Sequence, residues 1–307
     1  MINFIGNYRK AYLLSLILIV AGIISLAIFG LNLGIDFTGG TVFQVTLGED
    51  FSMEEVEAAL EPFEELEGAA IQVVEGRDLA GAPTDEGLII RGPYMGEERR
   101  QAVMEEFQNR FPQMDMEDSR EESVGAVIGA ELTRQAILSL VVAILAMVAY
   151  ITFRFEFRFA LATISALLHN IIIVLGIFSV LQLEINVPFV AAILTVFGYS
   201  VNDTIVIMDR IRENIKHRKK SDYAAVVNHS INQNLVRSIN TSLTTLFVLA
   251  ALLFGFHYFI GSLDLVVFVV ALILGVFVGT YSSIFIASPL WLNLQDYNFK
   301  LTRRKAA

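Results

Sequence analysis

The sequence predicts a polytopic α-helical membrane protein with six transmembrane helices and one small α+β domain outside the membrane. Hydrophobic residues make up 55% of the 307-residue chain and charged residues only 18%, so the chain is more apolar than soluble domains are. The charge is also uneven, because most acidic residues gather between positions 33 and 133 while the long apolar runs hold almost none. We therefore expect the apolar runs to lie in lipid and the acidic segment to lie in water.

Six apolar runs are long enough to cross a bilayer, whose hydrocarbon core takes about 20 helical residues. They cover residues 11–31, 135–153, 159–181, 187–208, 238–259 and 265–290. The first run is longer than the apolar region of a usual signal peptide and lacks a clear cleavage site, which favours a retained signal anchor. We expect four divisions of the chain: 1–32 contains the first span, 33–133 forms the outer domain, 134–292 contains spans two to six, and 293–307 is a basic tail. Within the third division, residues 209–237 are expected to form a cytoplasmic loop.

Basic residues indicate the orientation of these spans, since loops rich in lysine and arginine face the cytoplasm. They occur before the first span, between spans two and three, between spans four and five, and after span six. The short connections on the other side, residues 182–186 and 258–264, have none. Both termini are therefore expected in the cytoplasm, and residues 33–133 on the opposite side.

Alternating and amphipathic patterns predict four strands and two helices in the outer domain. The strands are expected at 41–47, 70–75, 87–91 and 116–124, and the helices at 52–61 and 96–110. Ser52 and Glu55 form a capping box for the first helix, and Val103, Met104 and Phe107 give the second a core-facing side. The order β-α-β-β-α-β is that of a ferredoxin-like fold. The domain's negative charge fits either solubility beside an anionic membrane or a surface for basic or unfolded clients.

A carboxylate lies inside the fourth span, where Asn202 and Asp203 follow Gly198. An ionisable residue within a span costs at least about 2.5–3.5 kcal/mol on insertion scales, so its presence calls for a reason. One interpretation is that Asp203 pairs with a neighbouring helix and holds the bundle together. The other is that it changes protonation as ions pass, since burial disfavours the charged form.

The beginning of the fifth span offers a partner for Asp203. Arg237 lies at the same side of the membrane, and Thr241, Thr244 and Thr245 continue from it along one helical stripe. Such hydroxyls can serve interhelical hydrogen bonding, or they can line a hydrated path that faces the carboxylate. The sequence leaves both interpretations open.

Three weaker features complete the candidate residues. His169, next to Asn170 in span three, is a possible proton relay or a satisfied packing residue. Gly275, Gly279 and Ser283 repeat at four-residue spacing in span six, which favours close helix packing. Asp36, Gly39 and Gly40 follow the first span, and the paired glycines predict a special turn. That turn is either a plain linker or a rigid junction that transmits movement between the membrane and the outer domain.

Several function classes are excluded or disfavoured by what the sequence lacks. The chain has no cysteine and four histidines, so disulfides are excluded and a zinc site is not expected. Its net charge of −10 argues against nucleic-acid binding. It has no phosphate-binding loop and no serine-hydrolase or metalloprotease motif. We expect a protein that is not an enzyme and that uses no cofactor or nucleotide.

Four strings, in order and on the expected spans, resemble the SecF branch of the SecD/SecF family. The matching strings are GIDFTGG at 34–40, 197–213 in span four, 237–242 at the start of span five, and 279–289 in span six. The resemblance implies a subunit of the bacterial Sec protein-export machinery, in the RND superfamily, that sits in the cell inner membrane. It implies a complex with SecD and association with the SecYEG channel and the translocating preprotein. It also implies that the proton motive force assists export, with protons as the coupling ion.

The resemblance assigns roles to two residues. The family's proton-active carboxylate of span four matches Asp203, and its important arginine of span five matches Arg237. Many relatives have His-Asp in span three, where this chain has His169-Asn170, and an asparagine cannot titrate. Two alternatives remain: an RND-type proton-coupled half-transporter for small molecules, and a scaffold of the translocon that conducts no protons. Drug exporters carry two far larger outer insertions, which disfavours the first.

Overall fold

A computed structural model describes residues 1–47, 51–77, 83–216, 222–260 and 262–295. Contacts within the chain divide it into two compact units, which we describe separately. The helical unit comprises Met1–Asn32, Leu138–Phe256 and the segment from Ser262 onward. The sheet unit comprises Leu33–Ile137 and His257–Gly261. The domain boundaries given from the sequence stay predictions.

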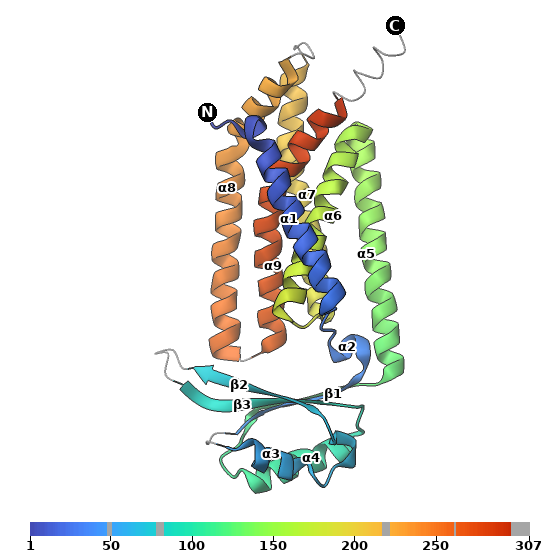
Figure 1. Cartoon of the computed structure of the whole chain (residues 1–307), viewed down its shortest axis with the longest axis vertical. Helices are drawn as coiled ribbons and strands as arrows, with labels where there is room; N and C mark the ends of the chain where they lie inside the picture. The colour runs from blue at the N-terminus through green and yellow to red at the C-terminus, as the bar shows by residue number, and fades with distance from the viewer. Residues whose placement is uncertain (48–50, 78–82, 217–221, 261, 296–307) are drawn as a thin grey trace. The chain divides into compact units, whose positions relative to one another are not determined.

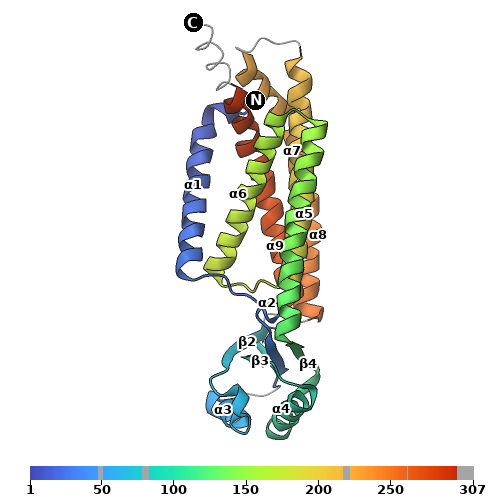
Figure 2. The ribbon, with the colours of Figure 1, turned by 90° about the vertical axis from the view of Figure 1, so that its right-hand side faces the viewer.

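The sheet unit has the predicted order of strands and helices (Figure 1). Its elements are β1 (Gly40–Thr46), α3 (Met53–Leu60), the short η1 (Glu64–Leu66), β2 (Ala70–Arg77), β3 (Pro83–Gly92), α4 (Glu97–Arg110) and β4 (Asp115–Val124). The strand order is β2-β3-β1-β4, and every neighbouring pair is antiparallel. Figure 2 shows α3 and α4 on one face of this sheet. The ferredoxin-like fold is therefore confirmed.

Local sequence signals explain these elements. The capping box is present, because the Ser52 side chain accepts a hydrogen bond from the Glu55 backbone while the Glu55 carboxylate accepts one from the Ser52 backbone. The predicted core residues of α4, namely Val103, Met104 and Phe107, are buried. They pack with alternate residues of β1, because successive side chains of a strand point to opposite faces of the sheet.

Six helices in the described part of the chain are long and apolar enough to cross a membrane. The six are α1 (Phe4–Ile28), α5 (Ala126–Arg154), α6 (Phe157–Leu181), α7 (Val187–Ile215), α8 (Tyr223–Gly255) and α9 (Leu263–Ser282). A π-helical turn, η4 (Ser283–Ala287), follows α9. The predicted number of spans is therefore confirmed. Gly22 of α1 and Gly176 of α6 allow a close approach, since a Cβ on Gly176 would lie 2.6 Å from the Gly22 Cα.

The segment 209–237, predicted as a cytoplasmic loop between spans, is not an irregular connection, and its place in the cytoplasm stays a prediction. Helix α7 continues to Ile215 and α8 begins at Tyr223, so most of the segment is helical. The reason is that the helices bury apolar side chains beyond the spans, with Ile211, Val227 and Ile231 fully buried. The basic residues at 218–220 and those of the tail beyond 295 lie outside the described residues.

Candidate functional site

Asp203 lies where α7 contacts α8, and it is half-buried. Its Oδ1 accepts a hydrogen bond of 2.6 Å from the Ser238 hydroxyl. Its Oδ2 is buried and has no hydrogen-bond partner among the described residues. A buried polar atom without a partner is costly, so such atoms call for an explanation. The chain therefore supplies one donor to this carboxylate and leaves its second oxygen able to take up a proton.

Arg237 does not pair directly with Asp203 as the sequence predicted. It is exposed, and no ion pair joins it to Asp203 in the part of the chain that the structure describes. It acts on the carboxylate only through the longer-range attraction between the charges. Since successive helical residues are rotated by about 100°, Ser238 faces α7 while Arg237 faces away from the unit.

The predicted threonine stripe follows Arg237 rather than the carboxylate. Thr241 and Thr244 are exposed and Thr245 is partly buried. Their hydroxyls donate to carbonyls of their own helix at distances of 2.8–3.0 Å. Asn202, beside Asp203 on α7, is also exposed. Within the described residues these hydroxyls therefore form no hydrogen bond to Asp203, and their part in a hydrated path stays a prediction.

Serines on the other side of α8 are the groups that meet α7, and the sequence analysis did not single them out as a set. Ser242 lies one turn after Ser238, and it accepts a hydrogen bond of 3.1 Å from the Tyr199 hydroxyl. It is also hydrogen-bonded to Thr280 of α9 at 2.6 Å. The spacing of Ser238 and Ser242 at i and i+4 was the signal that could have found them.

His169 begins a buried polar network that connects α1, α6 and α7. Its Nε2 is hydrogen-bonded to the Ser15 hydroxyl and its Nδ1 to the Asn170 amide oxygen, each at 3.0 Å. Asn170 donates to the Ser200 hydroxyl at 2.9 Å. Ser15 is also hydrogen-bonded to the Tyr281 hydroxyl at 3.0 Å. His169 thus has both ring nitrogens occupied within the chain, as a packing residue would.

The small residues of α9 lie against α7. A Cβ on Gly275 would overlap Val196, and one on Gly279 would come within 3.2 Å of Ser200. Ser283 is hydrogen-bonded to Thr204 at 2.8 Å. It also lies near enough to interact with the Asp203 carboxyl, although their geometry falls short of a hydrogen bond. Close packing of α9 against α7 brings the Ser283 hydroxyl of η4 to the edge of the Asp203 site.

The Gly39-Gly40 turn lies within the sheet unit, after the short helix α2 (Ile35–Thr38) that contains Asp36. Gly39 has φ 71° and Gly40 has φ 134°, angles that residues with a side chain rarely adopt. A Cβ on Gly40 would come within 2.8 Å of the Gly92 carbonyl oxygen. A Cβ on Gly129 of α5 would come within 3.2 Å of the Gly39 nitrogen. The turn is therefore tightly packed against the start of α5, and sequence reasoning missed Gly129.

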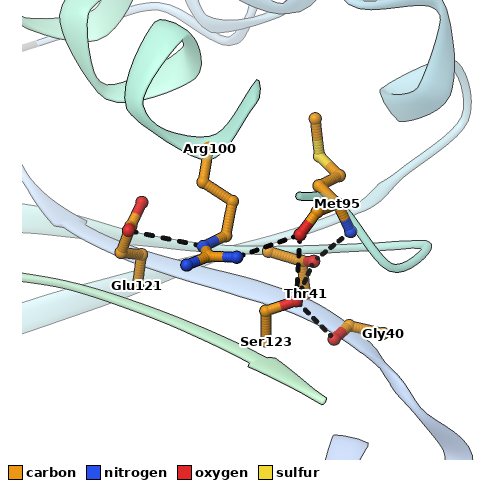
Figure 3. A network of polar contacts seen from close by, with 6 residues as sticks. All are labelled: Gly40, Thr41, Met95, Arg100, Glu121 and Ser123. Carbon is orange, nitrogen blue, oxygen red and sulfur yellow. Dashed lines mark hydrogen bonds and ion pairs between the residues drawn. The ribbon is translucent and has the colours of Figure 1, made fainter. Parts of the chain in front are cut away.

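Figure 3 shows how the strands beside this turn are tied together. The Ser123 hydroxyl is within hydrogen-bonding distance of the Gly40 carbonyl, the Met95 carbonyl and the Thr41 hydroxyl. The Met95 nitrogen donates to Thr41 at 2.9 Å. Arg100 donates to the Met95 carbonyl and pairs with Glu121 at 3.3 Å. Strand β1 is thus fixed to strand β4 and to helix α4 at the point where the turn ends.

The fold and the site define a multi-pass membrane protein with a ferredoxin-like unit after its first span and a carboxylate within its fourth. No group of three histidine or acidic side chains that could hold a metal ion occurs among the described residues. The family model for the protein-export membrane protein SecD/SecF, C-terminal, matches residues 103–297, and that for the SecD/SecF GG motif matches residues 24–50. The chain therefore belongs to the SecD/SecF family.

Relatives along the whole chain agree with this assignment. Protein translocase subunit SecF of Magnetococcus marinus is 40% identical over 311 residues, covering 99% of this chain and 94% of that protein. SecF of Sebaldella termitidis is 38% identical, covering 91% of this chain and 87% of that protein. SecDF of Thermus thermophilus is 38% identical, covering 95% of this chain and 38% of that longer protein.

Two solved structures are similar to this chain. One is the crystal structure of SecDF, described as a translocon-associated membrane protein from Thermus thermophilus. It has a TM-score of 0.78 at 35% identity, covering 96% of this chain. The other, SecDF in a super-membrane-facing form, has a TM-score of 0.68 at 36% identity, covering 100% of this chain. The chain spans only 39% and 40% of the length of these two SecDF chains.

Proposed function

We propose that this protein is a proton-coupled, non-enzymatic subunit of the bacterial Sec protein-export machinery. It works with SecD beside the SecYEG channel and uses the proton motive force to assist the translocating preprotein. The observation that carries this proposal is the Asp203 carboxyl within an apolar span, with one donor from Ser238 and none to its buried Oδ2. The similarity to SecF proteins over almost the whole chain supports the same role.

The proton step uses the two oxygens of Asp203 differently. A proton entering from outside binds Oδ2 and makes the carboxyl neutral, while Oδ1 keeps its hydrogen bond to Ser238. The hydrogen bond from Ser238 then meets a neutral carboxyl instead of a charged one, and the weakened contact lets α7 and α8 shift relative to each other. Release of the proton to the cytoplasm restores the charge. The membrane potential supplies about 2.3 kcal/mol per charge for each 100 mV.

The exposed polar residues of α7 and α8 indicate where a partner binds. Arg237 and Thr241 of α8 and Asn202 of α7 are exposed within or at the edge of the predicted spans. Polar groups within a membrane almost always face protein or a water-filled cavity. We propose that helices of SecD cover this face and place a carboxylate opposite Arg237. The hydrated path then lies between the two proteins rather than within this chain.

The remaining assignments follow the same proposal. The protein lies in the inner membrane of a bacterial cell with both termini in the cytoplasm, and the sheet unit lies outside. Lipids surround the exposed apolar faces of α5 and α8. Protons are the coupling ion, and no further cofactor, nucleotide or nucleic acid takes part. The packed Gly39-Gly129 contact, which lies within the sheet unit, supports a rigid turn at Asp36, Gly39 and Gly40.

Asp203→Asn in vesicles that contain SecD and SecYEG tests the proposal. We expect export after the ATP-driven stage to lose its response to the proton gradient, and proton conductance to fall to the background. Asp209→Asn is a matched control, because Asp209 lies on the same helix beyond the predicted end of the span. Unchanged stimulation and conductance in Asp203→Asn would contradict the proposal.

Two alternatives predict different results. A scaffold without proton flow keeps export in Asp203→Asn but loses it in Gly279→Leu, which disturbs the α7–α9 contact near Ser200. A half-transporter for small molecules would move a substrate against its gradient in vesicles without SecYEG. The half-transporter is the less favoured alternative, because drug exporters carry two far larger outer insertions and this chain has one small ferredoxin-like unit.

A further inference from the structure

A cavity in the sheet unit has an apolar floor. It has a volume of about 460 Å³ and lies between α3, η1 and the start of β2. Its floor is formed by the buried side chains of Leu60, Phe63 and Leu66 and the partly buried Ala69 and Ile71. The volume falls within the range of roughly 300–1,000 Å³ that is usual for ligand pockets. The cavity is thus large enough to hold apolar side chains of another molecule.

The rim of the same cavity is acidic. Glu57, Glu61, Glu64 and Glu67 line it and are exposed. The neighbouring Arg99 donates two hydrogen bonds to Glu65, which hold the pKa of that carboxyl below its usual value. Arg99 also attracts Glu64. Within the described residues, no ion pair compensates the other three rim glutamates. The rim therefore attracts cationic groups.

An open strand edge adjoins the cavity. Strand β2 lies at one edge of the sheet, and among the described residues it pairs with β3 alone. It begins at Ala70, directly after cavity residue Ala69. Unpaired backbone groups of an edge strand can bind an extended chain by main-chain hydrogen bonds, while an adjacent pocket selects its side chains. Both parts of such a site are present here.

We propose that this cavity binds an extended, positively charged segment of the polypeptide being exported. One or more apolar side chains of the segment fill the floor between Phe63 and Ile71, its basic side chains face Glu57, Glu61 and Glu67, and its backbone lies along β2. This inference rests on the proposed function, because an exported polypeptide is unfolded and offers such segments. Binding tolerates many sequences, since main-chain hydrogen bonds are common to all of them.

Peptide binding to the full chain in nanodiscs of zwitterionic lipid tests the inference. The probe is a fluorescent, unstructured serine-rich peptide with two lysines flanking a leucine, and the control peptide has glutamates in place of the lysines. We expect the lysine peptide to bind more tightly, and Glu61→Lys to weaken it about fivefold, since exposed charge pairs are individually modest. Glu105→Lys, an equal charge change on the exposed side of α4, should change binding less than twofold.

A second variant and a crosslink locate the binding site. Ala69→Trp should fill the cavity and weaken binding without changing the charge. A photoreactive group at the leucine of the peptide should crosslink to floor residues, which mass spectrometry can identify. Binding that neither Glu61→Lys nor Ala69→Trp weakens would overturn the inference. A photoreactive group placed in the cavity of the complex with SecD that crosslinks to SecD alone, and never to the peptide, would also overturn the inference.

The test separates this inference from the proposed function. The peptide-binding measurement needs no proton gradient and no SecD, and Asp203→Asn should bind the peptide as the unchanged protein does. If Asp203→Asn loses proton-driven export while Glu61→Lys and Ala69→Trp both bind the peptide unaltered, the cavity site is overturned and the proposed function is not. If the peptide binds specifically at the cavity while Asp203→Asn leaves export unchanged, the proton role of Asp203 is overturned and the cavity site is not.

Discussion

The polar groups around Thr41 and those around Asp203 differ in how many hydrogen bonds join them to one another. In the sheet unit, Ser123, Met95 and Arg100 form a network whose members bond to one another. In the helical unit, Asp203 has one donor, and Arg237 faces away from the bundle. Several mutual hydrogen bonds stabilise one arrangement around Thr41, although Glu121 Oε2, like Asp203 Oδ2, has no hydrogen-bond partner among the described residues. The hydrogen bonds of the sheet network stabilise the fold, whereas the role of Asp203 in proton coupling is the proposal made above.

The largest expected effect comes from Arg237→Gln, which removes the charge that faces out of this chain. Proton-driven export with SecD should fall to the level of ATP-driven export alone, because the partner carboxylate loses its counter-charge. The stability of the isolated chain should change by less than about 0.5 kcal/mol, as for other surface substitutions. Export assays in vesicles and thermal unfolding in detergent measure the two quantities.

Arg212→Gln is the matched control, because Arg212 is exposed on α7 beyond the predicted span. It should leave both quantities unchanged. A strongly destabilised Arg237→Gln chain would instead show that the arginine belongs to a closed network like that around Thr41.

Gly40→Ala should be the most destabilising substitution at the junction. Its Cβ would lie 2.8 Å from the Gly92 carbonyl oxygen, at φ 134°. Overpacking of this kind typically costs about 1–3 kcal/mol, and the backbone angle adds to that cost. Limited proteolysis and hydrogen exchange of the sheet unit measure the loss. Gly125→Ala is the control, since its Cβ would meet only Tyr94 at an ordinary 3.8 Å; equal effects would contradict a packed junction.

Arg100→Met should break the closed network directly. It removes the donors to the Met95 carbonyl and to Glu121, and unsatisfied buried groups cost about 1–3 kcal/mol. Arg99→Met removes an equal charge from an exposed pair with Glu65 and should have a smaller effect. Denaturant unfolding of the two variants compares them. Equal losses would show that the network of Figure 3 contributes no more than a surface pair.

Ser52→Ala should give the smallest effect, about 1 kcal/mol for the loss of a helix cap. The Ser52 backbone and hydroxyl hold the pKa of Glu55 below its usual value of 4.5. Because the folded pKa is lowered, this contribution is present at neutral pH and is lost as the pH falls through the lowered pKa. The difference in stability between Ser52→Ala and the unchanged chain should therefore shrink in acid. A difference that grows below pH 4.5 would contradict the capping geometry.

The sequence predicted most of the fold because each element has a local cause. The alternation of β1, the capping box of α3 and the length of the apolar runs each depend on neighbours within a few turns. The sequence did not predict the helices within 209–237, where α7 and α8 extend beyond the apolar runs and bury Ile211 and Val227. Hydropathy alone could not reveal these contacts. The parts of α7 and α8 that extend beyond the apolar runs carry many polar residues, so their mean hydropathy resembles that of a loop.

The sequence by itself determined that a carboxylate, Asp203, lies within the fourth span and that the fifth span begins with Arg237 and hydroxyls. Only the tertiary structure decided that Ser238, rather than Arg237, bonds to Asp203, and that Gly129 packs against Gly39. The physical reason is rotation: one residue along a helix turns the side chain by about 100°. Which side of α8 meets α7 is set by packing across the whole bundle, and no short stretch of sequence encodes it.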